Sequence, residues 1–352
     1  MSVPVAVGVD ALNLLRDRRG IGRYVRALLQ VWHRAYPERI APTLLVPHAF
    51  PGLLARRFAA ALGVPHVRLA RRSRAGQLGL DLVWYPWNGM TWTPPVRSVV
   101  TIHDVWPFVS PASDGRRRER EQRHYLHGVK HAVRFIAPSQ FTKAEAIRYL
   151  HLPTERIDVV PQGVMALTGG GVQPAQVSGA QRYVLFVGEP ERRKDLETLA
   201  RAMQKLPERS RATTALVIAG RGADGVERPE GTRVEIEGEV SDERLASLYT
   251  GAAALAFPSR YEGFGFPVLE AMLYGTPVVA SDAASVPEAG GDAALYFHAG
   301  DSDELAHVLD RVLTDEALAR RMAAAGRARA SVMSQELCAR RTLEVFERVA
   351  GR

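Results

Sequence analysis

Cysteine is nearly missing from the sequence, and long apolar runs are missing too. The 352 residues include one cysteine, Cys338, which excludes a disulfide framework and a cysteine metal cluster and fits a reducing compartment. No apolar run approaches the roughly 18 residues that span a bilayer. The N-terminal residues include Asp10 and lack a basic segment, so they predict a first strand and not a signal peptide. We therefore expect a cytoplasmic protein.

Internal repeats and long low-complexity tracts are also missing, which argues against a repeat architecture. The length instead predicts about two domains of ordinary size, each able to bury its own core. A content of 46% hydrophobic and 24% charged residues is typical of a globular protein.

Acidic residues are scarce in the first part of the chain. Residues 1–160 carry 24 Lys and Arg against 11 Asp and Glu, a net charge of +13, whereas the remainder carries 22 against 27, a net charge of −5. The basic residues cluster at 16–19, 56–57, 68–74 and 116–123. No zinc spacing, RNA-binding motif or basic recognition helix accompanies them, so we expect no nucleic-acid partner. An anionic membrane surface and a merely solvated surface both remain open.

Short apolar runs alternate with helical patterns along the chain. Strands are predicted at 3–9, 41–46, 64–69, 82–85, 98–102, 134–137, 157–160, 183–188, 214–220, 234–239, 252–257 and 276–280. Helices are predicted at 24–35, 52–62, 116–132, 139–150, before Leu206, after Val240, at 268–274 and at 334–349, with Ser139 as an N-cap. This alternation predicts the α/β class, with mostly parallel sheets covered on both faces.

Residues 166–181 form the clearest candidate linker. They contain three consecutive glycines, no charge and little that could pack. The predicted domains are therefore 1–165 and 182–333.

The stretch 252–280 reads as strand, glycine loop, helix and strand. Pro267 suits the first turn of the helix, Gly265 precedes it, and Gly275 ends it. The start of such a helix presents N–H groups and partial positive charge, which favour a phosphate. Glu262 and Glu270 flank this place, and carboxylates accept hydrogen bonds from the vicinal hydroxyls of a sugar or a ribose. The alternative is that Glu262 is a solvated loop residue and Glu270 only favours the helix dipole.

The run E-G-F-G-F-P-V-L-E, followed by A-M-L-Y-G-T-P-V-V-A-S-D and P-E-A-G-G-D-A-A, resembles the E-x7-E region of retaining glycosyltransferases of family GT4. The resemblance covers essentially the whole chain and is densest between Tyr183 and Asp292. It implies the GT-B fold, in which two Rossmann-like domains face a central cleft. It also implies that the last helix, residues 334–352, crosses back to the first domain.

Other segments resemble the same family. T-I-H-D places His103 and Asp104 just past a buried strand, although a lone histidine there is more often structural. In R-G-I-G-R-Y, Gly20 and Gly22 would let the backbone approach the donor closely, and an ordinary tight turn is the alternative. This run resembles the N-terminal loop of mannosyltransferase-like members. In I-D-V-V-P-Q-G-V, Gln162 stands where asparagine is usual.

In the second domain, Arg193 and Lys194 resemble the pair that neutralises the donor diphosphate, although such pairs are often only solvated. Gly238 and Val240 resemble the strand end that lines the nucleobase pocket. The string G-R-G-A-D-G lacks the following helix that a dinucleotide fingerprint requires, so we interpret it as a loop. D-S-D at 301–303 precedes a helical pattern, so helix capping is favoured over metal binding.

The resemblance implies a retaining, metal-independent hexosyltransferase without a cofactor. Glu262 would bind sugar hydroxyls and Glu270 the donor ribose, while Phe264 and Gly265 would offer N–H groups to the diphosphate. His103 would contact the reaction centre, with Asp104 beside it in the same motif. GDP-mannose is the first-choice donor. The expected acceptor is a saccharide or a polyprenyl-pyrophosphate-linked saccharide in cell-surface polysaccharide synthesis, at the inner face of the membrane.

Several alternatives stay open. The donor could be a UDP- or dTDP-sugar. A catalytically inactive GT-B binding or partner protein is a different class, which degenerate carboxylates or a missing Arg-Lys pair would favour. Sugar-nucleotide epimerases and phosphorylases of related shape would be distinguished by their products.

Overall fold

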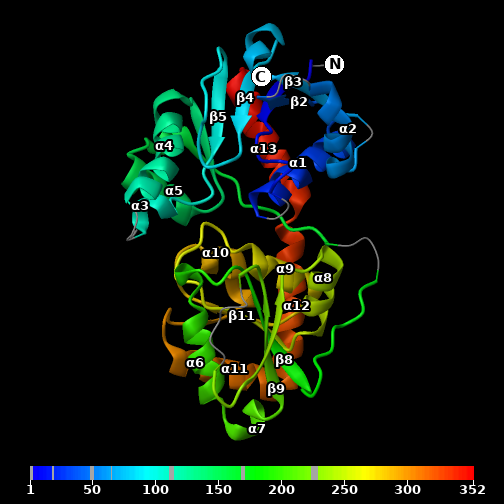
Figure 1. The fold of residues 1–352 in the computed structure, drawn as a ribbon, viewed down its shortest axis with the longest axis vertical. Helices are drawn as coiled ribbons and strands as arrows, with labels where there is room; N and C mark the ends of the chain where they lie inside the picture. Colours follow the sequence, from blue (N-terminus) through cyan, green and yellow to red (C-terminus); the bar gives the residue numbers. More distant parts are fainter. Residues whose placement is uncertain are drawn as a thin grey trace. The chain divides into compact units, whose positions relative to one another are not determined.

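A computed structural model describes residues 3–17, 20–47, 51–64, 66–110, 115–167, 171–222 and 229–352. The chain divides into two compact units (Figure 1). Unit 1 contains Met1–Gly163 and Gln335–Arg352, and unit 2 contains Val164–Ser334. Each unit has its own parallel sheet with helices packed against it, as the alternation of strand and helix patterns predicts.

The sheet of unit 1 has seven strands in the order β3-β2-β1-β4-β5-β6-β7. Its strands are β1 Val5–Asp10, β2 Ile40–Val46, β3 Arg68–Arg71, β4 Leu82–Tyr85, β5 Arg97–Thr101, β6 Arg134–Ala137 and β7 Ile157–Val159. Six of the seven predicted strands agree with these bounds to within two residues. β3 begins later than predicted, because only Arg68–Arg71 pairs with β2.

The helices of unit 1 are α1 Ile21–Ala35, α2 Pro51–Leu62, α3 Trp106–Val109, α4 Gly115–His131, α5 Gln140–Leu150 and α13 Gln335–Ala350, with 3₁₀ turns at Arg72–Gln77 and Thr154–Arg156. Ser139 caps α5 as predicted, because its side chain accepts a hydrogen bond from the Thr142 N–H at 3.0 Å. The C-terminal helix α13 packs on α1, where the Trp32 indole donates to the Ala339 carbonyl at 2.9 Å. The last helix is therefore part of the first unit's core.

The sheet of unit 2 has six strands in the order β10-β9-β8-β11-β12-β13. Its strands are β8 Arg182–Val187, β9 Thr214–Ala219, β10 Arg233–Gly238, β11 Ala254–Phe257, β12 Val278–Ser281 and β13 Leu295–Phe297. Its helices are α6 Leu196–Lys205, α7 Glu208–Arg211, α8 Asp242–Gly251, α9 Phe266–Tyr274, α10 Val286–Gly290, α11 Ser302–Thr314 and α12 Glu316–Val332, with 3₁₀ turns at Arg192–Lys194 and Gly291–Ala293.

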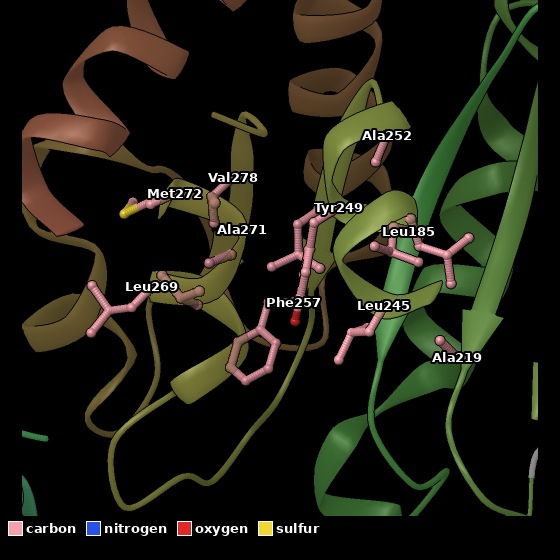
Figure 2. Close-up of a cluster of buried hydrophobic side chains, with 14 of the residues drawn as sticks. Leu185, Ala219, Leu245, Tyr249, Ala252, Phe257, Leu269, Ala271, Met272 and Val278 are labelled. Atoms are coloured by element: carbon pink, nitrogen blue, oxygen red, sulfur yellow. The ribbon is translucent and has the colours of Figure 1, made fainter. Parts of the chain in front are cut away.

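Figure 2 shows how α8 and α9 pack with β11 in one core cluster of unit 2. Tyr249 and Phe257 are completely buried, and Leu269 and Met272 are nearly so. Met272 also lies against Gly326 of α12, where an added Cβ would come within 3.1 Å of its Cγ. The helix that carries Glu270, the second glutamate of the E-x7-E motif, is thus fixed from both sides by apolar packing.

The structure of unit 2 decides two predictions, one on the linker 166–181 and one on the D-S-D run at 301–303. The stretch 166–181 was expected to be an unpacked linker, and this is wrong for its described second half. Ala175 and Val177 are buried, and the Ala175 N–H donates to the Ser247 carbonyl at 2.9 Å. The interpretation of D-S-D is confirmed, because Asp301 caps α11 by accepting from the N–H groups of Asp303 and Glu304, both at 2.9 Å.

Residues 223–225 of the G-R-G-A-D-G string lie outside the described residues, so its interpretation as a loop stays a prediction. The helices of the described residues include none long and apolar enough to cross a membrane.

Candidate active site

Each sheet has one place where the strand order reverses. In unit 2 it lies between β8 and β11, and in unit 1 between β1 and β4. Ligands of open α/β sheets bind outside the carboxyl ends of the strands at such a switch point. The R-R-K segment follows β8 and the E-G-F-G loop follows β11, so the strand order brings these two motifs to one place in unit 2.

Glu262 forms ion pairs with both predicted cations. Its carboxylate accepts a hydrogen bond from Arg193 Nη1 at 3.0 Å, and the second oxygen accepts from Lys194 Nζ. The three side chains are exposed by only 10%, 20% and 11% in the order Glu262, Arg193, Lys194. A carboxylate and two cations are therefore concentrated in a largely desolvated place.

Opposing effects act on the pKa of Glu262. Burial raises it, but the charges of Lys194 and Arg193 and the hydrogen bond from Lys194 outweigh burial and hold the pKa below its ordinary value. Glu262 is therefore ionised at neutral pH and serves as the counter-ion of the two cations.

Further contacts fix the two loops to each other. The Arg260 N–H donates to the Arg193 carbonyl at 2.8 Å, and Arg260 Nε donates to the Asp195 carboxylate at 2.6 Å. Asp195 has a left-handed backbone conformation at the start of α6 and also accepts from Thr198 Oγ1 at 2.8 Å. The segment that carries the two cations is thus held to the second loop by these bonds as well as by Glu262.

The start of α9 has the features that the sequence predicts. Gly265 precedes it with φ 104°, which a residue with a side chain rarely adopts, and Pro267 stands in the first turn. Phe264 and Tyr261 are buried, so the aromatic residues of the loop anchor it to the core. The Ser285 hydroxyl donates to the Glu262 carbonyl oxygen at 2.8 Å, which fixes the loop from the side of α10.

Glu270 lies on α9 and is 4% exposed. Its carboxylate accepts a hydrogen bond from the Tyr249 hydroxyl of α8 at 2.9 Å. The Tyr249 ring in turn stacks on Tyr274, with ring centroids 5.9 Å apart. Tyr249 was not predicted from the sequence, because its spacing along the chain carries no signal of this cross-helix contact.

Three glycines stand at or just past the carboxyl ends of β8, β9 and β10. A Cβ on Gly220 would come within 1.9 Å of the Gly188 carbonyl oxygen, so no side chain fits there. The Gly220 N–H donates to the Gly238 carbonyl at 2.8 Å. Of the predicted base-pocket residues, Gly238 has φ 62° and Val240 is nearly buried. Gly188 and Gly220 were not predicted as site residues. They were placed at the ends of the predicted strands 183–188 and 214–220, and the observed strands stop one residue before each glycine.

In unit 1, the His103 ring lies just past β5 and both of its nitrogens are engaged. Nε2 lies 2.8 Å from the Pro86 carbonyl oxygen, and the Gln162 side-chain amide nitrogen lies 2.7 Å from Nδ1. Burial lowers the pKa of His103 to about 4, against a smaller opposing effect of the Pro86 hydrogen bond. The ring is therefore neutral at physiological pH.

The other predicted site residues of unit 1, Asp104, Gly20 and Gly22, have contacts or conformations that stabilise the local backbone. Asp104 accepts from the Trp106 N–H at 2.9 Å at the start of α3. Gly20 caps α1 with φ 54°, and a Cβ on Gly22 would come within 1.8 Å of the Asp17 carbonyl oxygen. The Gly22 N–H donates to the Asp17 carboxylate at 2.9 Å. Gly20 thus has a backbone conformation that favours glycine, and Gly22 closely approaches the backbone of its own loop. Arg19 of the same motif lies outside the described residues.

Among the described residues, no group of three or more His, Cys, Asp or Glu side chains is placed to hold a metal ion.

Known proteins resemble both units. Residues 18–165 match the family described as Glycosyltransferase Family 4, and residues 173–329 match Glycosyl transferases group 1. The chain is 35% identical over 272 residues to O-antigen chain mannosyltransferase B of Escherichia coli, a match covering 71% of this chain and 70% of that protein. It is 42% identical over 117 residues to MMP alpha-(1->4)-mannosyltransferase of Mycolicibacterium hassiacum, covering 32% of this chain and 28% of that protein. Sucrose-phosphate synthase of Thermosynechococcus elongatus has a similar fold, with a TM-score of 0.71 at 20% identity, over 99% of this chain and 100% of that one.

Proposed function

The chain belongs to the GT-B glycosyltransferases of family GT4, and from this premise we propose that it transfers mannose from GDP-mannose to a saccharide acceptor with retention of the anomeric configuration. The observation that carries the proposal is the buried cluster of Glu262, Arg193 and Lys194 at the switch point of unit 2. Such a cluster suits a substrate that brings both phosphate charge and sugar hydroxyls.

The chemical demand of the reaction is stabilisation of the leaving group. As the glycosidic bond to phosphate breaks, negative charge collects on the nucleoside diphosphate while the sugar becomes oxocarbenium-like. Arg193 and Lys194 supply two fixed positive charges, and the N–H groups of Phe264 and Gly265 at the start of α9 supply hydrogen-bond donors. We propose that these groups take the place that a metal ion has in other transferases.

Five further predicted residues have a proposed role on the donor or at the reaction centre. Glu262 accepts hydrogen bonds from hydroxyls of the transferred sugar, and Glu270 accepts from the donor ribose. Gly238 and Val240 border the nucleobase. His103 contacts the transferred sugar or the reaction centre.

The choice of GDP-mannose rests on two grounds. Two of the relatives described above are named mannosyltransferases. Asp242 begins α8 two residues after Val240, and its exposed carboxylate could accept hydrogen bonds from the N–H groups of guanine. Uracil lacks that pair of donors, so a UDP-sugar would leave the carboxylate without this partner.

The proposed acceptor is a polyprenyl-pyrophosphate-linked saccharide at the inner face of the membrane. The first 160 residues have a net charge of +13, which a small neutral acceptor in free solution does not require. An anionic lipid surface and a pyrophosphate-linked acceptor would both be attracted by that charge.

The test is a donor panel with the purified chain and a mannosylated oligosaccharide acceptor. GDP-mannose, UDP-glucose and dTDP-rhamnose are compared with and without EDTA, and the anomeric configuration of the product is read by NMR. We expect transfer from GDP-mannose that survives EDTA and yields the retained anomer. Transfer from a UDP-sugar alone would overturn the donor. Loss with EDTA and rescue by manganese would overturn the role of Arg193 and Lys194.

A further inference from the structure

His103 sits in a set of contacts that fixes its protonation as well as its position. A carbonyl oxygen can only accept a hydrogen bond, so the 2.8 Å contact with Pro86 requires the proton on Nε2. A neutral imidazole then has a lone pair on Nδ1, which needs a donor. The Gln162 amide nitrogen, 2.7 Å from Nδ1, is that donor.

These partners come from separate strand ends. Pro86 directly follows β4, His103 follows β5, and Gln162 follows β7, so all three stand at the carboxyl edge of the unit 1 sheet. Asn88, with the left-handed φ of 63° that asparagine tolerates, accepts from the His103 backbone N–H at 2.5 Å. The Thr142 hydroxyl of α5 donates to the His103 carbonyl at 3.3 Å.

The ring is also held by packing. Tyr24 of α1 meets it edge-on, with ring centroids 5.2 Å apart and planes at 86°. Tyr24 keeps its own proton, because burial raises its pKa far above the ordinary value. The imidazole therefore has a fixed orientation beside a neutral aromatic ring, and His103 and Gln162 are 8% and 7% exposed.

We propose that Gln162 is a positioning residue that holds His103 in the tautomer with its proton on Nε2, so that His103 acts in glycosyl transfer as a hydrogen-bond donor and not as a base. A sugar oxygen at the reaction centre takes the Nε2 hydrogen bond from Pro86, while Gln162 keeps Nδ1 occupied. This inference rests on the proposed function, because only there does His103 face the transferred sugar.

A carboxylate at position 162 would reverse the arrangement. In a Gln162→Glu variant the new carboxylate accepts instead of donating, so it draws a proton onto Nδ1 and raises the pKa of His103. Below that pKa the imidazolium still carries a proton on Nε2. Above it, the neutral ring prefers the proton on Nδ1, and the donor toward the sugar is lost. Gln162→Asn keeps an amide, and Gln162→Leu removes the donor.

The first experiment reads the tautomer without any activity. The full-length chain is labelled with ¹⁵N-histidine, the ring signals are recorded from pH 5 to 8, and the His103 signals are assigned by their loss in His103→Asn. We expect the wild-type ring to be protonated on Nε2 and unprotonated on Nδ1 throughout this range. A proton on Nδ1 in the wild type would overturn the proposal.

The second experiment reads the reaction. We expect a flat kcat profile between pH 5 and 8 in the wild type and in Gln162→Asn, and a kcat that falls with rising pH in Gln162→Glu. Gln162→Leu should lose roughly ten-fold or more in kcat, because a buried acceptor is left without a donor. Gln122→Glu is the matched control, since Gln122 of the same unit donates to the Pro107 carbonyl at 2.8 Å away from His103. We expect it to leave the pH profile unchanged.

The outcomes separate this inference from the proposed function. If the wild type transfers no sugar while its His103 is protonated on Nε2, the proposed function fails and the tautomer assignment stands. If the wild type is active and Gln162→Glu loses activity only in proportion to its folded fraction, with an unchanged pH profile, Gln162 is merely structural and the proposal is overturned.

Discussion

Replacing Glu262 by glutamine tests the charge cluster of unit 2 most directly. The change keeps the size of the side chain and leaves Arg193 and Lys194 without their shared carboxylate, in a place where both are largely buried. Removing one partner of a buried ion pair costs about 3–5 kcal/mol. Arg193 keeps its contact with Glu191 at 2.7 Å, and the amide oxygen can still accept one bond, so we expect the lower end, about 3 kcal/mol.

Thermal unfolding of the ligand-free protein measures this loss. A change of 1 kcal/mol shifts Tm by about 2–4 °C for a domain of this size, so Glu262→Gln should lower the Tm of unit 2 by roughly 6–12 °C. Glu191→Gln is the matched control. It removes a carboxylate from the same arginine, but Glu191 is 47% exposed, and an exposed pair contributes about 0–1 kcal/mol. Equal shifts in the two variants would refute the reasoning.

The pH dependence follows from the same pKa. The pKa of Glu262 is lowered in the folded state, after the two cations outweigh the effect of burial. Its contribution to the free energy of unfolding is therefore present above the unfolded-state pKa and is lost as pH falls through the folded-state pKa. The Glu262→Gln variant has no carboxylate to protonate at this position, so it does not lose this free energy of unfolding as the pH falls. The difference in free energy of unfolding between wild type and variant should therefore become smaller toward low pH.

Two further predictions concern the nucleotide and the membrane. Glu270→Ala should weaken GDP binding about ten-fold if its carboxylate holds the ribose, measured by calorimetry beside Tyr249→Phe, which removes only the neighbouring hydroxyl. Equal GDP affinity in wild type and Glu270→Ala would remove the ribose assignment. The chain should co-sediment with liposomes of anionic lipid at low salt and much less at high salt, because attraction of this kind fades with the Debye length, at about 1 kcal/mol for each basic residue near the surface. Binding that ignores lipid charge and salt would point to a hydrophobic contact instead, and absence of binding would leave the charge of residues 1–160 without this role.

Most strands of the two sheets could be predicted, because parallel strands covered on both faces are short, continuous apolar runs. β13 was missed, since its three residues form no run that stands out from the loops around it. α12 was missed because its 17 residues are rich in alanine and arginine, and only Met322, Gly326 and Ala330 among them are buried. The packing of Ala175 and Val177 could not be predicted either, because it depends on where α8 lies and not on their own neighbours in sequence.

The residues of the candidate site were easier to predict than their partners. Arg193, Lys194 and Glu262 stand in motifs that a sequence displays, but their ion pairs depend on β8 lying beside β11, which no single motif encodes. The same holds for Gln162. The sequence showed it only as a departure from asparagine, and its contact with His103 arises because the ends of β5 and β7 lie at one edge of the sheet.

The pairing of Glu262 with two cations also bears on how a donor would enter the site. In the structure this carboxylate neutralises Arg193 and Lys194, and so offsets the cost of keeping two cations desolvated. The diphosphate of the proposed donor would bring its own negative charge to the same cations, so it would displace or share Glu262. A free nucleoside diphosphate leaves the displaced carboxylate without new donors, whereas a sugar nucleotide offers it the hydroxyls of its sugar. We therefore infer that Glu262 makes the protein bind the intact donor more tightly than the product nucleotide. The Glu262→Gln variant should bind GDP at least as tightly as the wild type does, so the difference in affinity between donor and product should become smaller. The same variant should lose turnover.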